Sequence, residues 1–332
     1  MFKREEFIKS IFSISSPKEF NEKALELFRF QVENVEPYSR FVAHLGVNYS
    51  QIEEHTEIPF LPISFFKSEK IISSNLGVNG VFRSSGTTGS VKSEHLVHDF
   101  DLYKSSFMNY FNSIYGNPKE AVVLALLPSY LGRKDSSLVY MVNELIQSSE
   151  SLDSGFYLEN ASELASKIEQ LKNEKKPVYL FGVTFALLAL AEQYKGASWG
   201  HLTVIETGGM KGKGEELTRG ELHSLLSSKL GLSTVYSEYG MTELFSQAYA
   251  EGEWFTSPKW MKILVRETED PFSYVPLNRT GGINIIDLAN VDSCAFIATQ
   301  DLGKLNAENK FQVLGRFDNS DVRGCNLMIQ SL

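Results

Sequence analysis

Small hydroxyl-bearing residues, two glycines and a lysine lie close together in "RSSGTTGSVKSEH", residues 83–95. Glycines let a backbone curl until several N–H groups point at one anion, and small hydroxyl groups add donors without bulk. A lysine adds a point charge that suits phosphate. The segment therefore predicts a phosphate-binding loop, and a linker of the same composition is the alternative. The candidate residues are Ser84, Ser85, Gly86, Thr87, Thr88, Gly89 and Lys92.

A second group of candidate residues lies in "YSEYGMTEL" (236–244), which follows a predicted strand. Tyr239 and Gly240 form a predicted tight turn, and Thr242 and Glu243 follow at the carboxyl end of the strand, where open α/β sheets bind ligands. A carboxylate at this position suits Mg²⁺, which usually takes one or two carboxylates together with substrate phosphates. The alternative is a Thr-Glu pair that only begins a helix.

Two further motifs follow in "TQDLGKL" (299–305) and "LGRFDNSDVRG" (314–324). Asp301, if it lies in a turn, can accept hydrogen bonds from both hydroxyls of a ribose. Arg316, fifteen residues later, can contact phosphate or ribose. Each motif alone is a weak signal, and the four in this order form a much stronger one.

The elements that would position these motifs alternate between strands and helices. Strands are predicted at 121–127, 177–183, 202–209 and 233–240, and helices at 100–114, 137–148, 161–173, 184–195 and 214–230. This alternation is typical of a parallel sheet that helices cover on both faces. No flexible linker separates this region from the β-like segment that follows it, so the site is expected to lie between the two parts.

The segments before and after this region do not alternate between strands and helices. The first 50 residues read as helices, with Ser16 as an N-cap, Pro17 at the first helical position and Glu19 as the capping-box partner. Two prolines in "EIPFLPISFFKSEKI" (57–71) predict an extended connector without regular helix. Short β-like runs follow from about residue 260. We therefore expect a helical segment (1–56), an α/β nucleotide-binding core (57–255) and a β-rich subdomain that completes the site (256–332).

Charge and composition exclude several classes of function. A net charge of −9 over 332 residues argues against broad nucleic-acid contact, which needs a basic face. Two cysteines, Cys294 and Cys325, do not make a disulfide framework, so the expected compartment is the reducing cytoplasm. No apolar run approaches the roughly 20 residues of a membrane span, and no signal peptide is recognised at the N-terminus.

The four motifs in this order resemble those of the adenylate-forming superfamily, which includes the acyl-CoA synthetases and the phenylacetate-CoA ligases. The segments "IPFLPISFFKS", "ETGGMKGKGEE" and "GRFDNSDVRGCNLM" are similar to those of LuxE-type acyl-protein synthetases, and the resemblance covers residues 57–328. It implies the α/β fold of the N-terminal domain of these enzymes, with mostly parallel sheets flanked by helices and a smaller β-rich subdomain. It also implies a ligase that uses ATP and Mg²⁺ to convert a carboxylic acid, in this branch a fatty acid, into acyl-AMP and pyrophosphate.

The resemblance also assigns roles to the candidate residues. The loop that begins at Ser84, with Lys92, is implied to grip the ATP phosphates, and Glu243 to hold Mg²⁺. Asp301 is implied to bind ribose and Arg316 to contact ribose or phosphate. The remaining implied neighbours of the nucleotide are Tyr239, Gly240, Met241 and Thr242, together with Gly208 and Gly209 beside the adenine.

One departure from the family concerns the small C-terminal domain that supplies a catalytic lysine in most members. The chain ends eight residues after Gly324, so this domain and its lysine are expected to be absent. Charge at the α-phosphate is then expected to be stabilised by Mg²⁺, Lys92, Arg316 or another basic residue. Lys211 and Lys213 are further candidates.

The acyl acceptor is expected to be a thiol, and Cys325 in "RGCNLM" is the candidate. Cysteine is strongly nucleophilic and partly ionised at neutral pH, and the neighbouring Arg323 would lower its pKa. The resemblance implies that such a cysteine is acylated and passes the acyl group to a reductase or carrier protein. Three alternatives remain: Cys325 as a buried apolar residue, an acyl-CoA ligase with CoA as acceptor, and a non-catalytic subunit that binds nucleotide or acyl groups.

Other reactive residue types are given structural interpretations. His95 and His98 have a metal-like spacing without an evident third ligand, and Cys294 lies in a predicted core strand. Arg133, Lys134 and Asp135 follow a strand and are expected to border the acyl or phosphate site. The apolar segment 181–190 is expected to pack in the core, with an acyl tunnel as the alternative.

Overall fold

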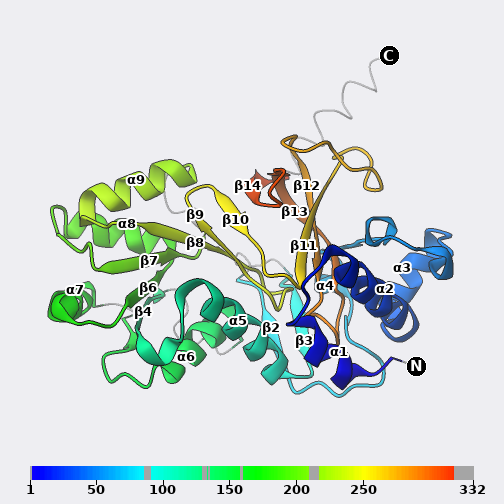
Figure 1. Cartoon of the computed structure of the whole chain (residues 1–332), viewed down its shortest axis with the longest axis horizontal. Coiled ribbons are helices and arrows are strands. Elements are labelled where there is room, and N and C mark those ends of the chain that lie inside the picture. The colour runs from blue at the N-terminus through cyan, green and yellow to red at the C-terminus, as the bar shows by residue number, and fades with distance from the viewer. Residues whose placement is uncertain are drawn as a thin grey trace, which may run out of the picture.

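The computed structural model describes residues 2–85, 91–128, 133, 135–157, 160–208 and 217–317. Within these residues, one twelve-stranded sheet has the order β11-β12-β13-β14-β10-β9-β8-β7-β6-β4-β5, and β1 pairs with β13 (Figure 1). The strands are β1 (Leu61–Pro62), β4 (Val122–Leu126), β5 (Gly155–Phe156), β6 (Val178–Gly182), β7 (Leu202–Glu206), β8 (Val235–Tyr239), β9 (Ala248–Glu251), β10 (Trp254–Thr256), β11 (Met261–Arg266), β12 (Gly281–Asp287), β13 (Phe296–Leu305) and β14 (Phe311–Arg316). A separate hairpin consists of β2 (Gly80–Arg83) and β3 (Glu94–Val97).

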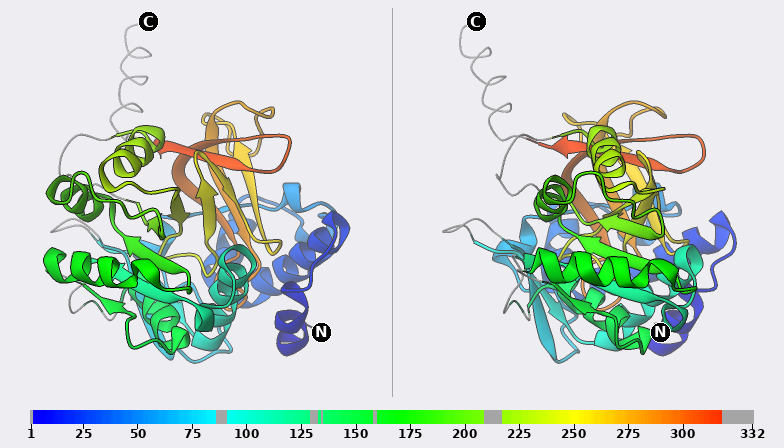
Figure 2. Two further views of the ribbon diagram at one scale, coloured as in Figure 1. Left: turned by 60° about the vertical axis from the view of Figure 1, so that its left-hand side comes forward. Right: turned by 90° about the vertical axis from the view of Figure 1, so that its left-hand side faces the viewer.

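The half of the sheet from β5 to β8 is parallel. Helices α5 (Phe100–Tyr115) and α6 (Ser137–Ser149) cover one face of it, and α8 (Thr184–Gln193) and α9 (Arg219–Leu230) cover the other (Figures 1 and 2). Helix α7 (Ala161–Gln170) lies at the outer end of this half. Every residue of β4 and of β6 is buried, as expected for parallel strands with helices on both faces. The predicted α/β alternation is confirmed.

The half of the sheet from β9 to β14 is antiparallel. It continues directly from the parallel half, because β9 pairs in antiparallel fashion with β8. The predicted β-rich region from about residue 260 therefore exists, and its strands extend the same sheet. Strand β13 is central to it, since it pairs with β12, β14 and the short β1.

The N-terminal helices α1 (Arg4–Ile11), α2 (Pro17–Asn34) and α3 (Glu36–His44) pack beside the antiparallel half (Figure 1). The side chain of Ser16 accepts a hydrogen bond from the backbone N–H of Glu19, which confirms the predicted N-cap. The carboxylate of Glu19 accepts hydrogen bonds from the backbone N–H of Ser15 (2.7 Å) and from its hydroxyl (2.9 Å), and a backbone hydrogen bond with Ser16 also lowers the pKa of Glu19.

The connector at 57–71 differs in part from the prediction. It contains β1 and the one-turn helix α4 (Phe65–Ser68), which begins three residues after Pro62. The prolines lie ahead of this turn and therefore do not interrupt it. Short 3₁₀ turns occupy Tyr49–Gln51, His55–Glu57, Pro118–Glu120 and Leu171–Asn173.

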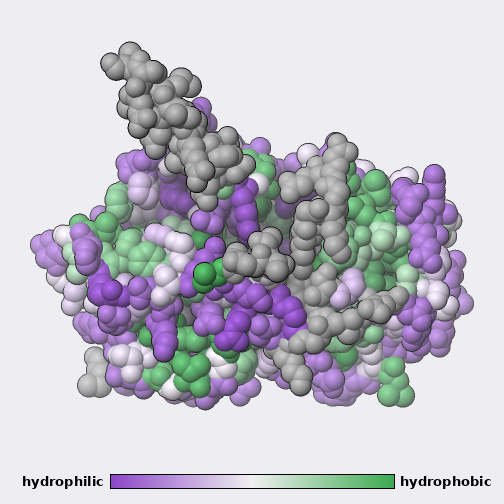
Figure 3. All heavy atoms as spheres, turned by 180° about the vertical axis from the view of Figure 1, so that it is seen from behind, coloured by the Kyte–Doolittle hydropathy of each residue, from purple (hydrophilic) through white to green (hydrophobic). Residues whose placement is uncertain are grey.

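Polar residues cover most of the surface that is visible from behind, with scattered apolar areas between them (Figure 3). Among the helices that the structure describes, none is long and apolar enough to cross a membrane.

Candidate functional site

The hydroxyl-rich loop is the connection of the β2–β3 hairpin. Its base is closed by two bonds, from Ser84 N–H to the Ser93 carbonyl (3.1 Å) and from Ser93 N–H to Ser84 Oγ (3.0 Å). Ser85 and Lys92 are exposed on either side of the loop. The candidates Gly86, Thr87, Thr88 and Gly89 lie outside the described residues.

The segment after β4 fastens the base of this loop. Arg133 Nη2 donates to the carbonyls of Arg83 (2.7 Å) and Ser84 (3.2 Å), and its Nε donates to Asp135 Oδ1 (3.3 Å). The backbone N–H of Arg83 in turn donates to the carbonyl of Asp135 at 2.7 Å. Arg133 and Asp135 thus contact the start of the predicted phosphate loop, while Lys134 lies outside the described residues.

The motif 239–243 leaves the carboxyl end of β8 and is held in place from its far side. Asp287 Oδ2 accepts from the backbone N–H groups of Phe245 (2.9 Å) and Ser246 (2.8 Å). Asn290 Nδ2 donates to the carbonyl of Glu243 at 2.8 Å. Two buried polar side chains therefore fix the backbone directly after the motif.

His95, on β3, joins the hairpin to the same motif. Its Nδ1 lies 2.9 Å from the carbonyl of Thr242, and its Nε2 lies 2.9 Å from Ser293 Oγ. The side chain is 1% exposed, and burial lowers its pKa to about 4. A neutral ring that donates from Nδ1 accepts at Nε2, so Ser293 is the donor of the second bond. His95 has the predicted structural role, and His98 lies near the surface with Nδ1 2.7 Å from the carbonyl of Gly77.

Glu243 lies where the motif meets the hairpin. Its side chain is buried, with 5% of the residue exposed. Burial raises the pKa of Glu243, while a hydrogen bond with Ser93 and the charges of Arg316 and Lys67 oppose this shift. The predicted metal ligand is therefore next to the base of the predicted phosphate loop.

A magnesium ion fits this position only as part of a nucleotide complex. Within the described residues, no group of three or more His, Cys, Asp or Glu side chains could hold a metal ion alone. Mg²⁺ needs one or two carboxylates when phosphates and water supply its other ligands. Glu243, a single buried carboxylate beside a hydroxyl-rich loop, matches that donor set.

Asp301 connects β13 to the motif and to β14. Tyr239 donates its hydroxyl to Asp301 Oδ2 (2.7 Å), and Arg316 Nε donates to Asp301 Oδ1 (3.2 Å). Asp301 and Arg316 are direct partners across the β13–β14 ladder. The Asp301 side chain is 8% exposed and that of Arg316 is 79% exposed, so the guanidinium is available to a ligand. The expectation that Asp301 lies in a turn is wrong, because it lies inside a ten-residue strand.

The remaining candidates lie at the same edge of the sheet. Gly208 follows the end of β7, is exposed and has a φ of +53°, a backbone conformation that favours glycine. Gly240 is exposed, while Met241 and Thr242 are partly exposed after β8. Gly209 lies outside the described residues, as do Lys211 and Lys213.

Of the two cysteines, Cys294 lies within the described residues. Cys294 is fully buried, its thiol donates to the carbonyl of Phe296 (3.5 Å), and burial raises its pKa to about 12. It is a core residue, as predicted. Cys325 and Arg323 lie outside the described residues. In the segment 181–190, Leu187 and Leu190 are buried, which agrees with the core-packing interpretation.

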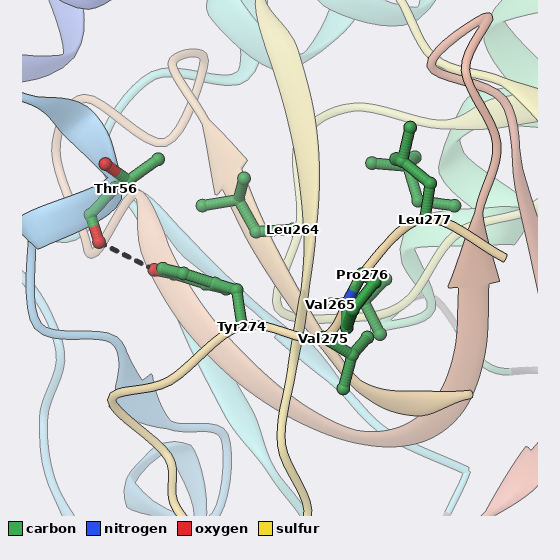
Figure 4. Close-up of a pocket in the computed structure, with 8 residues that line it drawn as sticks. Thr56, Leu264, Val265, Tyr274, Val275, Pro276 and Leu277 are labelled. Carbon is green, nitrogen blue, oxygen red and sulfur yellow. Dashed lines mark hydrogen bonds between the residues drawn. The ribbon is translucent and has the colours of Figure 1, made fainter. Parts of the chain in front are cut away.

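A surface pocket of about 180 Å³ contains none of the predicted site residues (Figure 4). Tyr274 lies against it and donates to the carbonyl of Thr56 at 2.8 Å. Apolar side chains form the rest of its wall, from Leu264, Val265, Val275, Pro276, Leu277 and Leu305. Without charged groups, this pocket does not suit a nucleotide.

The sequence of residues 137–332 matches the family model described as "Acyl-protein synthetase, LuxE". The match covers more than half of the chain. The chain belongs to the LuxE acyl-protein synthetase family. No curated protein matches the sequence.

Solved structures show the same fold at low sequence identity. ATP-bound MatB from Rhodopseudomonas palustris aligns with a TM-score of 0.55 and 16% identity, over 72% of this chain and 48% of that chain. The chain thus spans about half the length of MatB. A 2-hydroxyisobutyryl-CoA ligase in complex with 2-HIB-AMP and CoA aligns with a TM-score of 0.68 and 14% identity, over 94% of this chain and 71% of that chain. The predicted fold of the adenylate-forming enzymes is therefore confirmed.

Proposed function

We propose that this chain activates a carboxylic acid with ATP, forms an acyl-adenylate, and transfers the acyl group to a thiol. One observation carries the proposal: the hairpin loop, Glu243 and the Tyr239–Asp301–Arg316 chain converge at the carboxyl edge of β8. Family membership and the likeness to an ATP-bound enzyme and to a ligase bound to an acyl-AMP support it.

The first step joins the acid to AMP. A carboxylate oxygen attacks the α-phosphorus of ATP, a new O–P bond forms, and the bond to the bridging oxygen breaks, which releases pyrophosphate. Asp301 would accept hydrogen bonds from the ribose hydroxyls, and the exposed Arg316 would contact ribose or phosphate. Ser84, Ser85 and Lys92 would bind the phosphates from the hairpin loop.

Glu243 is the residue that would hold Mg²⁺. The bound ion would neutralise part of the triphosphate charge. Asn290 and His95 position this region, because they bind the carbonyls of Glu243 and Thr242.

The second step transfers the acyl group. A thiolate sulfur attacks the carbonyl carbon of the adenylate, a thioester forms, AMP leaves with the electron pair of the broken bond, and the thiol proton passes to solvent. We assign the thiol to Cys325 and the acid to the fatty acids, on the resemblance to LuxE-type synthetases. The thioester would then be passed to a reductase or carrier protein.

We also propose the division into a helical segment (1–56), a nucleotide-binding core (57–255) and a subdomain that completes the site (256–332). The core would supply the phosphate loop and Glu243. The last part would supply Asp301 and Arg316.

The intact mass of the protein after incubation with ATP, Mg²⁺ and a panel of fatty acids tests the acceptor. The expected result is an acyl adduct that hydroxylamine removes and that Cys325→Ser does not form, whereas the buried Cys294→Ser retains it. Pyrophosphate release without an adduct would transfer the acceptor role to CoA or to another protein. ATP binding without pyrophosphate release would favour the non-catalytic subunit.

A further inference from the structure

Several polar side chains lie together on the face of β8 that α5 covers. Glu238 and Tyr249 are direct partners in the antiparallel β8–β9 ladder, so their side chains share one face. The ring of Tyr236, two residues before Glu238, packs edge-on against Tyr115 of α5, with centroids 5.4 Å apart. This contact identifies the shared face as the α5 side.

Thr207 and Gln247 belong to the same cluster. Glu206 accepts from Ser237 on the other face of the sheet at 3.1 Å, so the next residue, Thr207, points to the α5 side. A Cβ atom placed on Gly240 would lie 2.3 Å from Glu238 Oε1 and 3.3 Å from Gln247 Cγ, so both side chains meet beside Gly240. We call these residues the Glu238 cluster: Thr207, Glu238, Gln247 and Tyr249.

Three buried polar atoms of the Glu238 cluster have no hydrogen-bond partner within the described residues. They are Thr207 Oγ1, Gln247 Oε1 and Tyr249 OH. Gln247 and Tyr249 are each 4% exposed. Leaving a buried polar atom without a hydrogen bond is unfavourable, so three such atoms in one place indicate that a polar group occupies the cluster.

Glu238 adds a carboxyl group to the cluster, and no basic side chain of the described residues forms an ion pair with it. Glu238 is partly exposed. Burial and the charge of Glu206 raise its pKa to about 8. Together with Gln247 Oε1, it offers at least two acceptor sites to a ligand.

The position of the cluster connects it to the acid rather than to the nucleotide. Tyr239, the next residue, points to the opposite face and bonds to Asp301, which belongs to the proposed ribose site. The turn at Gly240 therefore separates the nucleotide from the Glu238 cluster. An acid whose carboxylate meets the α-phosphate at this turn would extend its other end toward the cluster.

We infer that the Glu238 cluster binds a hydroxyl or amino group of the substrate acid, which distinguishes this acid from an unsubstituted fatty acid. The inference rests on the proposed acid activation. Hydroxyl and amino groups both donate hydrogen bonds, which the acceptors of Glu238 and Gln247 require. An alkyl chain would displace water from these atoms and leave them without a partner.

Acid-dependent exchange of labelled pyrophosphate into ATP tests the inference on the wild-type chain. Hexanoic acid is compared with its 2-, 3- and 6-hydroxy and amino derivatives. The expected kcat/KM for the best substituted acid exceeds that for hexanoic acid by about tenfold or more. Exchange that is fastest with the unsubstituted acid would overturn the inference and leave acid activation intact. No exchange with any acid would count against both.

A pair of variants tests the role of the residue itself. Glu238→Leu removes the carboxyl group, and Glu251→Leu, at an exposed position on β9, is the matched control. We expect the ratio of kcat/KM for substituted over unsubstituted acid to fall about tenfold in Glu238→Leu and to stay unchanged in the control. Circular dichroism confirms that both variants fold. An unchanged ratio in a folded Glu238→Leu protein would refute the inference.

Discussion

His95→Phe is the substitution with the most specific expected result. The imidazole makes two hydrogen bonds of 2.9 Å and stacks on Phe245 with ring centroids 4.7 Å apart. Phenylalanine has a similar size and keeps the stacking, but leaves the carbonyl of Thr242 and the hydroxyl of Ser293 without their partner. Each unpaired group costs about 1–3 kcal/mol, and the serine hydroxyl can rotate, so we expect a loss of about 2 kcal/mol in the free energy of unfolding at neutral pH.

This loss should depend on pH. The pKa of His95 is lowered from 6.5 to about 4 by burial, so the unfolded chain binds its proton more readily than the folded chain. The stability that neutral His95 contributes is therefore complete above pH 6.5 and is lost as the pH falls toward 4. Between about pH 7.5 and about pH 5 the wild type loses about 2 kcal/mol through this residue, and the variant does not. The difference between the two proteins should then fall to near zero.

Urea unfolding of both proteins at the two pH values measures this difference. Other titrating groups are present in both proteins, so their contributions cancel in the difference between the two free energies of unfolding. Glu238 is one of these groups: its raised pKa reduces stability as the pH rises from 4.5 to about 8. His44→Phe, at an exposed position, controls for the added ring and should change stability by less than about 0.5 kcal/mol. If the free energies of unfolding of His95→Phe and wild type differ by the same amount at both pH values, His95 is not a buried neutral imidazole and the reasoning is refuted.

Three further predictions concern the site. Glu243→Gln should lower the rate of pyrophosphate release by about a hundredfold or more, because the variant keeps the shape of the side chain and loses the charge that would hold Mg²⁺. Asp301→Asn should raise the KM for ATP by about tenfold, equivalent to about 1.4 kcal/mol, with little change in melting temperature; an unchanged KM would place the ribose elsewhere. Asp287→Ala should lower the free energy of unfolding by about 2–4 kcal/mol, because the N–H groups of Phe245 and Ser246 lose their acceptor. Urea unfolding measures this loss, and a clearly smaller value would show that water replaces the carboxylate.

Much of the parallel half was predictable because its signals are local. The apolar runs of β4 and β6 and the helical spacing of aromatic residues in α5 need only neighbouring residues to be recognised. The position of Glu243 at the carboxyl edge was also predictable, because it follows the strand β8. Its proximity to Asp301 and to the hairpin loop depends on the fold, since Asp301 lies on antiparallel β13 and the loop belongs to the separate β2–β3 hairpin.

The groups that hold the site together were less predictable. His95 and Thr242 are 147 positions apart, and no periodic pattern connects them. Asp287 ends a buried strand that reads as apolar, so its role as an acceptor for Phe245 and Ser246 becomes evident only from the fold. Asp301 was expected in a turn, whereas the strand β13 passes this point with an irregular register between Leu302 and Gly303.

The products of nucleotide turnover test the central claim most directly. The chain is incubated with ATP, Mg²⁺ and the best acid of the panel, and the nucleotide products are separated and identified by mass. Adenylation predicts AMP, pyrophosphate and a transient acyl-AMP in the wild type, and none of them in Glu243→Gln. Formation of ADP and phosphate instead would show attack at the γ-phosphate and would contradict the account of the site.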